Sequence, residues 1–248
     1  MIKSRLKAVA QRYPNLTNPI WKALYPRSKY NIHMARDASE SRAEAFREIY
    51  HRNEWGSVET KSGNGSTLAA TGPIRRKLPG LLRKFGCETL LDAPCGDFHW
   101  MRLVDLGPVK YIGADIVPDI IEGLNADFAS ERRSFQVLDI VSDPLPRADL
   151  WLCRDVLFHL PTRDVMTCLR NFVSSDIRYL LTSTFPLSTA NPEIHPGGFR
   201  TINLRLPPFS LPRPLIEVDD YVPGFTPRVL GLWSNEQIKA WSATAPGP

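Results

Sequence analysis

The sequence predicts an α/β fold with a doubly wound, mostly parallel sheet, and two patterns support this prediction. Between residues 89 and 185, short apolar runs alternate with segments whose apolar residues recur at helical spacing. Towards the C-terminus, two further strand candidates lie close together and fit an antiparallel pair. The 248 residues allow one large domain or two small ones, and 43% hydrophobic and 23% charged residues are typical of a globular protein.

Helices are expected before the sheet. Ser41 and Glu44 form a capping-box pattern, and the apolar residues that follow, Ala43, Phe46, Ile49 and Tyr50, share one helical face. A loop rich in Gly, Ser and Asn spans residues 55–67. The next helix is expected over residues 68–85, with a break at the Pro79-Gly80 pair because proline lacks the N–H that a helix interior needs.

The strands of the predicted sheet are separated by helices. Strands are expected over residues 89–93, 110–115, 135–140, 149–154, 179–185, 215–219 and 228–233. Helices are expected over residues 98–106, from Pro118, from a Thr162 cap, and from a cap formed by Ser234 and Gln237. The chain has 22 prolines, more than a typical protein of this length, and most of the excess lies between residues 186 and 227. These residues are therefore expected to be rich in loops.

Composition excludes several classes of protein. No run of about 18 apolar residues exists, so we expect no membrane-spanning helix. The first 14 residues lack the apolar core of a secretory signal. The four cysteines form no C-x-x-C pair, so neither a metal site nor a disulfide framework is expected. We therefore expect a cytoplasmic protein whose cysteines are small buried hydrophobes.

The positive charge is concentrated at the N-terminus. Residues 1–60 hold 11 Lys and Arg against 6 Asp and Glu, whereas residues 61–248 hold 20 of each. We expect a basic arm and helix over residues 1–60 and one functional domain over residues 61–248. The arm is either a solvated tail or a weak contact to an anionic membrane surface, and without a dense Lys/Arg cluster it does not predict nucleic-acid binding.

Polar residues follow the first four predicted strands. Asp92 lies in the run Leu-Asp-Ala-Pro-Cys-Gly (residues 91–96), and Asp115 and Asp139 follow at intervals of 23 and 24 residues, each the length of one strand–helix–strand unit. The acids should therefore align along one sheet edge, where ligands of such sheets bind. The Gly96 turn lets backbone N–H groups approach a ligand, and Asp115 is placed for ribose hydroxyls. Asp92 disfavours a pyrophosphate, so the expected ligand combines a nucleoside, an amino acid and a positive centre.

These residues resemble the motifs of class I S-adenosylmethionine (SAM)-dependent methyltransferases. The resemblance rests on Asp92-Ala93-Pro94-Cys95-Gly96, Asp115, Leu138-Asp139-Ile140 and residues 149–160, and it covers about residues 60–240. The Asp-Ala-Pro-Cys-Gly turn is similar to that of a bacterial subgroup of this superfamily. The resemblance implies a Rossmann-like seven-stranded sheet with an antiparallel last strand, and SAM as the cofactor.

The resemblance also implies residue roles. Asp92 and the turn of Pro94, Cys95 and Gly96 would hold the methionine end, Asp115 would hold the ribose, and Asp139 with Ile140 would contact adenine. Ile116 and Arg154 complete the expected cofactor-binding set. The chain departs from the family pattern at Pro94 and Phe98, where many members have glycine, and the turn is therefore expected to be stiffer.

Candidates for the acceptor side follow the fourth and fifth strands. Asp155 and His159 are four residues apart, so on a helical turn the carboxylate would orient the imidazole as a catalytic base. The alternative is that Asp155 caps the turn and His159 packs beneath it. His195, Arg200 and Asn203 are the substrate-binding candidates, although a proline-stiffened surface loop explains them equally well. Residues 55–66 are either a cover over the cofactor or a flexible linker.

The leading functional hypothesis is O-methylation of a small molecule or glycan. The alternatives are a methyltransferase acting on nucleic acid or protein, and a non-catalytic nucleotide-binding partner, which turnover with a methyl donor would distinguish. The Asn/Asp-Pro-Pro-Tyr pattern of amino-group methylases is absent after the fourth strand, which argues against an exocyclic amine as acceptor. A nicotinamide dehydrogenase is disfavoured because G-x-G-x-x-G is missing.

Overall fold

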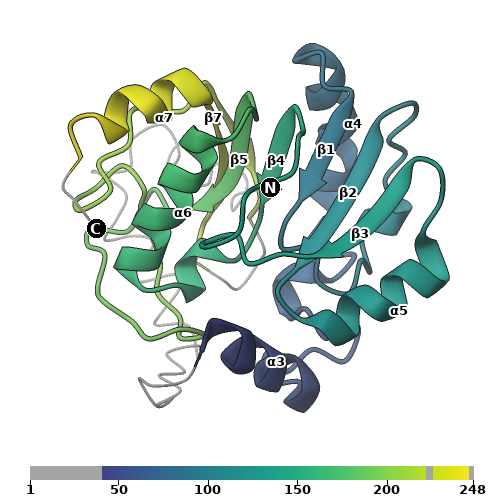
Figure 1. The fold of residues 1–248 in the computed structure, drawn as a ribbon. Coiled ribbons are helices and arrows are strands. Elements are labelled where there is room, and N and C mark those ends of the chain that lie inside the picture. The colour runs from purple at the N-terminus through teal and green to yellow at the C-terminus, as the bar shows by residue number, and fades with distance from the viewer. Residues whose placement is uncertain (1–40, 222–225, 246–248) are drawn as a thin grey trace, which may run out of the picture.

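A seven-stranded sheet forms the centre of the computed structural model, which describes residues 41–221 and 226–245 (Figure 1). The strand order is β3-β2-β1-β4-β5-β7-β6. The strands are β1 Thr89–Asp92, β2 Lys110–Asp115, β3 Arg133–Val137, β4 Leu150–Cys153, β5 Tyr179–Thr184, β6 Ile216–Asp219 and β7 Val229–Ser234. Strands β1 to β5 run parallel, and β7 is antiparallel to both β5 and β6. The predicted Rossmann-like sheet with an antiparallel last strand is confirmed.

Helices cover the sheet on both sides. They are α3 Arg42–Arg52, α4 Gly72–Lys84, α5 Pro118–Phe128, α6 Thr162–Ser174 and α7 Asn235–Ser242, with short 3-10 turns at Asn64–Ser66, Met101–Leu103 and Leu157–His159. The crossovers β2–α5–β3 and β4–α6–β5 proceed in opposite directions along the sheet, so right-handed connections place α5 and α6 on opposite faces. In Figure 1, α6 and α7 lie on the near face and α4 lies behind β1.

Local sequence signals explain where several helices begin. Ser41 and Glu44 form the predicted capping box of α3, and Ser234 and Gln237 form the one that starts α7. Pro118 occupies the first turn of α5, where a missing backbone N–H costs no helical hydrogen bond. The N-cap of α6 is Pro161 rather than Thr162, a shift of one residue.

Two expected helix features are wrong. The segment expected to be helical over residues 98–106 forms only the 3-10 turn Met101–Leu103. Phe98 has a φ of +57°, which is incompatible with a right-handed helix, and its ring packs against Tyr111, Phe128 and Phe135 at centroid distances of 5.1, 5.4 and 5.2 Å. Helix α4, in turn, continues through Pro79, because apolar residues on both sides of the proline, including Ile74 and Leu82, are buried on one face.

Helix α3 lies across the carboxyl edge of the sheet (Figure 1). Its first residue, Arg42, pairs with Asp139 after β3 and with Asp164 on α6, and its later residues Arg47 and His51 pair with Asp119 on α5. Phe46 and Ile49 are buried in the main core. The part of the expected arm that the structure describes thus packs onto the same core as the sheet.

The core is continuous and apolar. Trp151 and Trp233, expected to be core residues, are fully buried. The cysteines are also buried: Cys87, Cys95, Cys153 and Cys168 are free thiols, as expected. Burial raises the pKa of Cys87 to about 11 and that of Cys95 well above its usual value.

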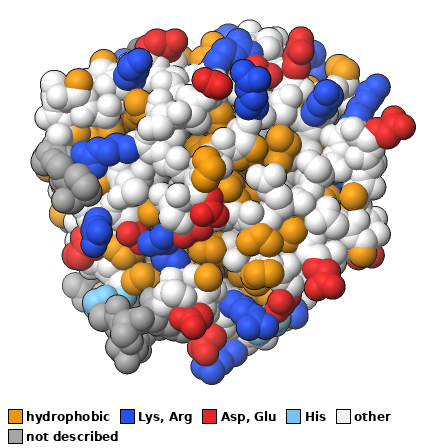
Figure 2. Space-filling view, in the orientation of Figure 1, with side chains coloured by type: hydrophobic (Ala, Val, Ile, Leu, Met, Phe, Trp, Pro, Cys, Tyr) orange, Lys and Arg blue, Asp and Glu red, His pale blue; other side chains and the backbone are white. Residues whose placement is uncertain are grey.

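The surface carries charges of both signs. Figure 2 shows Lys and Arg side chains interleaved with Asp and Glu side chains, with hydrophobic side chains between them. This matches the net charge of zero over residues 61–248. Within residues 41–221 and 226–245, no helix is long and apolar enough to cross a membrane. The basic segment 1–36, on which the expected membrane contact depends, lies outside the described residues.

Candidate active site

The predicted polar residues converge on one cavity at the carboxyl edge of the sheet. All nine expected cofactor-binding residues line this cavity: Asp92, Pro94, Cys95, Gly96, Asp115, Ile116, Asp139, Ile140 and Arg154. Asp155 lines it as well, whereas His159, His195, Arg200 and Asn203 are not among its lining residues. The structure therefore brings all the cofactor candidates together at one cavity but only one of the acceptor candidates, Asp155.

The turn after β1 brings the backbone close to its neighbours. Gly96 has a φ of +54°, and its N–H donates to Asp115 Oδ2 at 3.1 Å. A Cβ at Gly96 would collide with the side chain of Ser62. Glycine is therefore required here both for its φ and for the approach of residue 62.

Two buried carboxyl groups lie beside this turn. Asp92 is 2% exposed and accepts a hydrogen bond from the Tyr111 hydroxyl at 2.7 Å. Asp115 accepts from the backbone N–H groups of Gly96 and Val117, both at 3.1 Å. Burial raises the pKa of Asp92 to about 7 and that of Asp115 to about 6. A cation in the cavity would favour the ionised form of both groups.

Asp139 lies two residues beyond β3 and is fixed from two directions. Its Oδ1 accepts the backbone N–H of Val141 at 2.9 Å. Its Oδ2 accepts from Arg42 Nε at 3.1 Å and Nη2 at 2.7 Å. The apolar residues Leu138 and Ile140, on either side of Asp139, line the cavity too.

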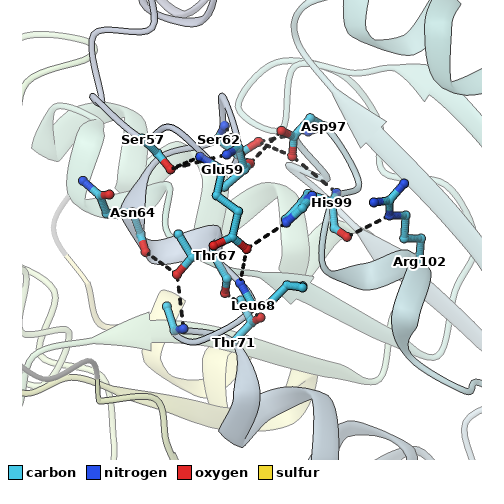
Figure 3. A network of polar contacts seen from close by, with 12 residues as sticks. Ser57, Glu59, Ser62, Asn64, Thr67, Leu68, Thr71, Asp97, His99 and Arg102 are labelled. Carbon is cyan, nitrogen blue, oxygen red and sulfur yellow. Dashed lines mark hydrogen bonds and ion pairs between the residues drawn. The ribbon is translucent and has the colours of Figure 1, made fainter.

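Residues 55–66, the covering loop, are fastened to the turn after β1 (Figure 3). The Asp97 carboxylate accepts from Thr60 Oγ1 at 2.6 Å, from the Lys61 N–H at 3.0 Å and from Ser62 Oγ at 2.9 Å. Glu59 contacts His99 Nε2 at 2.9 Å and accepts the backbone N–H of Leu68 at 2.6 Å. Trp55, Ser62 and Ser66 line the cavity, so the loop forms part of its wall, which favours a cover over a linker.

Three buried charged side chains and the half-buried Asp155 form a cluster at the end of β4. Arg154 Nη1 pairs with Asp155 at 3.1 Å and its Nη2 pairs with Asp220 at 3.1 Å; Arg228 Nη1 pairs with Asp155 at 2.7 Å and its Nε pairs with Asp220 at 2.9 Å. Burial acts to raise the pKa of Asp155, but Arg154 and Arg228 outweigh it and hold that pKa below its usual value. Arg154 Nη2 also donates to the Gly65 carbonyl at 2.8 Å, which connects the cluster to the covering loop.

The structure does not show Asp155 orienting His159. The Asp155 carboxylate instead pairs with the two arginines and accepts from Ser183 Oγ at 2.9 Å. His159 Nδ1 donates to the Gly198 carbonyl at 2.6 Å, which leaves Nε2 as the unprotonated nitrogen. Asp155 also has a φ of +59°, so it does not open the helical turn on which the expected pairing depended.

His159 lies one layer behind the cavity wall. Its ring packs against Trp55, which lines the cavity, at a centroid distance of 5.7 Å, and against Phe158 and Phe199 at 4.6 and 5.8 Å. Burial lowers its pKa, so the imidazole is neutral near pH 7. This packing agrees in part with the alternative in which His159 is a structural residue.

The three substrate-binding candidates have other contacts. Arg200 is buried and donates to Thr162 Oγ1 and to the carbonyls of Pro192 and Leu160. Asn203 is buried too, and its side-chain nitrogen donates to the carbonyls of Pro186 and Ser188. His195 is exposed. Arg200 and Asn203 thus hold the proline-rich loop together in this structure.

Several cavity residues escaped the sequence analysis. Arg42, Phe46 and Tyr50 come from α3, and Trp100 comes from the segment expected to be helical. Burial raises the pKa of Tyr50 to about 12, and Asp97 and Asp115 add to this shift. The helical face of Phe46 and Tyr50 signalled a buried side, but nothing in the sequence indicated that this side faces the strand ends.

Comparisons with known proteins identify the fold. The sequence matches no protein-family model and no curated protein. The structure is similar to PigF with SAH, with a TM-score of 0.55 and 16% identity over 91% of this chain and 72% of that one. It is also similar to the N-methyltransferase NodS from Bradyrhizobium japonicum WM9 in complex with S-adenosyl-L-homocysteine (SAH), with a TM-score of 0.53 and 15% identity over 75% and 98% of the two chains. The chain has the Rossmann-like methyltransferase fold.

A third structure with this methyltransferase fold is the magnesium protoporphyrin IX methyltransferase ChlM from Synechocystis PCC 6803 with bound SAM. Its TM-score is 0.51 and its identity 16%, over 79% of this chain and 99% of that one. The matches to two further solved structures cover 66% and 64% of the length of those chains.

Among the described residues, no group of three or more His, Cys, Asp or Glu side chains is placed to hold a metal ion.

Proposed function

We propose that the chain is a SAM-dependent methyltransferase that methylates an oxygen atom of a small molecule or glycan. The observation that carries this proposal is the convergence of Asp92, Gly96, Asp115 and Asp139 on one cavity at the carboxyl edge of the sheet. In a methyltransferase fold, this edge is where a nucleoside cofactor fits the available groups best.

The chemistry of the cavity suits this cofactor. Asp92 and Asp115 are buried carboxyl groups with raised pKa values, and a ligand with an ammonium group and a positively charged sulfur would compensate their burial. Apolar side chains that include Ile116, Leu138 and Ile140 line the part of the cavity near Asp139 and suit the faces of a nucleobase. The absence of a glycine-rich pyrophosphate loop fits a cofactor without phosphate groups.

Each element then has a role in binding. The turn of Pro94, Cys95 and Gly96, together with Asp92, holds the methionine end, and Asp115 beside Ile116 accepts from the ribose hydroxyls. Asp139 and Ile140 contact adenine. Arg154 lines the cavity at the end of β4 and anchors the covering loop through the Gly65 carbonyl.

The acceptor side lies at the end of β4. When bound, SAM supplies an electrophilic methyl group on a positively charged sulfur. Trp55 and the covering loop exclude water from the cavity and limit the orientations of the acceptor. The acceptor oxygen has to lose a proton. His159 is the better base of the two candidates, because Asp155 is held as an anion by two arginines, whereas the Gly198 carbonyl leaves His159 Nε2 free to accept. The imidazole packs behind Trp55, so this role requires Trp55 to move aside when the acceptor binds.

The neighbours are consistent with a small acceptor. The name of ChlM specifies magnesium protoporphyrin IX, which is a small molecule. NodS is named an N-methyltransferase, so acceptor panels should include amines as well as sugars, sugar phosphates and carboxylates.

The test begins with the cofactor, because no acceptor is needed. Mass spectrometry of the purified protein should detect retained SAH, and calorimetry should show SAH binding that Asp115→Ala weakens roughly ten- to a hundred-fold, since a hydrogen bond to a charged acceptor is lost. Asp127→Ala, at an exposed position on α5, is the matched control and should bind as the wild type does. Absence of SAH and SAM binding in the folded wild-type protein would overturn the proposal.

A further inference from the structure

Arg42 is a cavity residue that no strand-end motif contains. We infer that Arg42 determines specificity for the nucleobase of the cofactor, and that Arg42 and Asp139 together recognise the amino-bearing edge of adenine. The inference rests on the proposed function and extends it to a residue contributed by helix α3.

The position of Arg42 is fixed by two acidic residues from different elements. Its Nε and Nη2 donate to Asp139 Oδ2 at 3.1 and 2.7 Å, and its Nη1 donates to Asp164 Oδ2 at 3.0 Å. The Arg42 side chain is 24% exposed, and the Asp139 and Asp164 side chains are 19% and 16% exposed. Arg42 and Asp139 both line the cavity, whereas Asp164 does not. The guanidinium is thus held in one orientation before any ligand arrives.

Both members of the pair retain hydrogen-bonding capacity. A guanidinium has five N–H groups, of which Asp139 and Asp164 use three, so Nη1 and Nη2 each keep one without a partner among the described residues. The Asp139 carboxylate has about four acceptor positions. Val141 and Arg42 fill three of them. The pair therefore offers one acceptor and a neighbouring donor to the cavity.

This arrangement complements adenine in particular. The edge of adenine presents an amino donor next to a ring-nitrogen acceptor. A carboxylate beside a guanidinium presents the reverse order, so the amino group faces Asp139 and the ring nitrogen faces Arg42. A base with an oxo group at the same position places an acceptor opposite the Asp139 carboxylate, which is repulsive. Leu138 and Ile140 give the base an apolar surface but cannot distinguish the two edges.

The competing explanation is that Arg42 only fastens α3 to the sheet. Asp164 separates the two explanations, because it holds Arg42 from outside the cavity and does not contact a ligand there. Removing the Asp164 charge loosens the fastening but leaves the Arg42–Asp139 pair. Replacing Arg42 by methionine keeps the unbranched apolar stem of the side chain but removes every side-chain N–H group.

Calorimetry with SAH and with its 6-oxo counterpart, S-inosylhomocysteine, tests the inference. We expect the wild-type protein to prefer SAH by at least about tenfold. Arg42→Met should weaken SAH binding by about 10- to 100-fold and reduce this preference, as expected for a lost hydrogen bond from a charged group. Arg42→Lys should recover part of the affinity but not the preference, because an ammonium lacks the fixed fork. Asp164→Asn should stay within about threefold of wild type on both ligands.

The outcomes separate the inference from the proposed function. Wild-type SAH affinity and preference in folded Arg42→Met would overturn the inference alone. An equal loss in Asp164→Asn and Arg42→Met, with the preference unchanged in both, would overturn it too and assign Arg42 to fastening α3. Thermal unfolding of each variant shows whether it is folded. Failure of the wild-type protein to bind either ligand would overturn the proposed function, and the inference with it.

Discussion

Asp92 and Asp115 make the cavity sensitive to pH. Their pKa values, about 7 and about 6, lie well above the value near 3.9 of an exposed aspartate. In the ligand-free protein these groups bind more protons than they do in the unfolded chain between about pH 4 and pH 7. They therefore reduce the free energy of unfolding as pH rises through that window. The carboxylate forms of Asp92 and Asp115 thus destabilise the protein when no ligand is bound. A bound cation would stabilise these carboxylates, so the pair is suited to a cationic ligand.

Proton release on cofactor binding follows from these pKa values. A sulfonium or ammonium group favours the carboxylate forms, so SAM binding at pH 6.5 should expel protons, and SAM affinity should fall as pH decreases from about 8 to about 5. Calorimetry at pH 6.5 in two buffers with different ionisation enthalpies measures the release directly. Asp92→Asn should release fewer protons than wild type. Identical binding enthalpies in both buffers would contradict this account.

His159 gives a second prediction at the residue scale. His159→Ala should reduce turnover by about 10²- to 10⁴-fold, the usual contribution of a general base, and leave SAH affinity nearly unchanged because the expected cofactor contacts lie elsewhere. Since burial lowers its pKa, the wild-type rate should rise with pH through a value below the usual ~6.5. His51→Ala, at an exposed position on α3 that does not line the cavity, is the control.

Asp155 should behave differently from His159. Asp155→Asn leaves Arg154 and Arg228 without one of their anionic partners, so its main effect should be on the free energy of unfolding. Chemical denaturation measures this effect and needs no acceptor.

The turnover measurements on His159→Ala need an acceptor from the panel described above. Near-normal turnover in His159→Ala would remove His159 from the mechanism and support its structural interpretation.

At the scale of elements, the covering loop depends on Gly65. A Cβ at this position would lie 2.5 Å from Asp155 Oδ2 and 3.3 Å from Arg228 Nη1, so either the loop or the buried cluster has to move. We expect Gly65→Ala to lower the free energy of unfolding by about 1–3 kcal/mol, as overpacking usually does, and to weaken SAH binding. Chemical denaturation and calorimetry measure the two effects.

Gly123 on α5 provides the matched control. A Cβ there meets no atom within 4 Å. Gly123→Ala should therefore be neutral or stabilise the helix by up to about 1 kcal/mol. Equal stability and SAH affinity in Gly65→Ala and wild type would mean that the loop does not need its close contact with the cluster.

The elements also show what a sequence can predict. Parallel strands carry continuous apolar runs and end where their polar residues begin, so β1, β2 and β4 and the acids that follow them could be read directly. The course of residues 98–106 could not, because Phe98 has a positive φ and its ring packs against Phe128 and Phe135, which lie far along the chain. The continuation of α4 through Pro79 could not be predicted either, because it depends on the burial of apolar residues that precede and follow the proline in the helix.

At the scale of the whole molecule, the cavity is built from two distant parts of the chain. Residues at and after the strand ends line one part of it, and residues of α3 and the covering loop line another. The lining residues at the strand ends could be predicted because they belong to short motifs at regular intervals along the sequence. The contribution of Arg42 could not, because its partners Asp139 and Asp164 lie 97 and 122 residues away.

This construction predicts how the molecule responds to a ligand. On addition of SAH, amide hydrogen exchange should slow in α3 and in the covering loop together, since both contact the same cavity, and should change little in α7. Mass spectrometry of peptides from each element measures this. Equal exchange of residues 55–66 with and without SAH would make that segment a linker rather than a cover.

The buried cysteines have a consequence for the reactivity of the chain. A thiol reacts with alkylating reagents as its thiolate, and burial raises the pKa of Cys87 and Cys95 far above neutrality. A hydrogen bond with Cys153, together with burial, raises the pKa of Cys168 in the same way. All four thiols of the chain are buried, and the one in the cavity wall, Cys95, is only 7% exposed. Alkylation at neutral pH should therefore proceed only as fast as the protein unfolds. The rate at which the four cysteines are alkylated then measures the rate of unfolding.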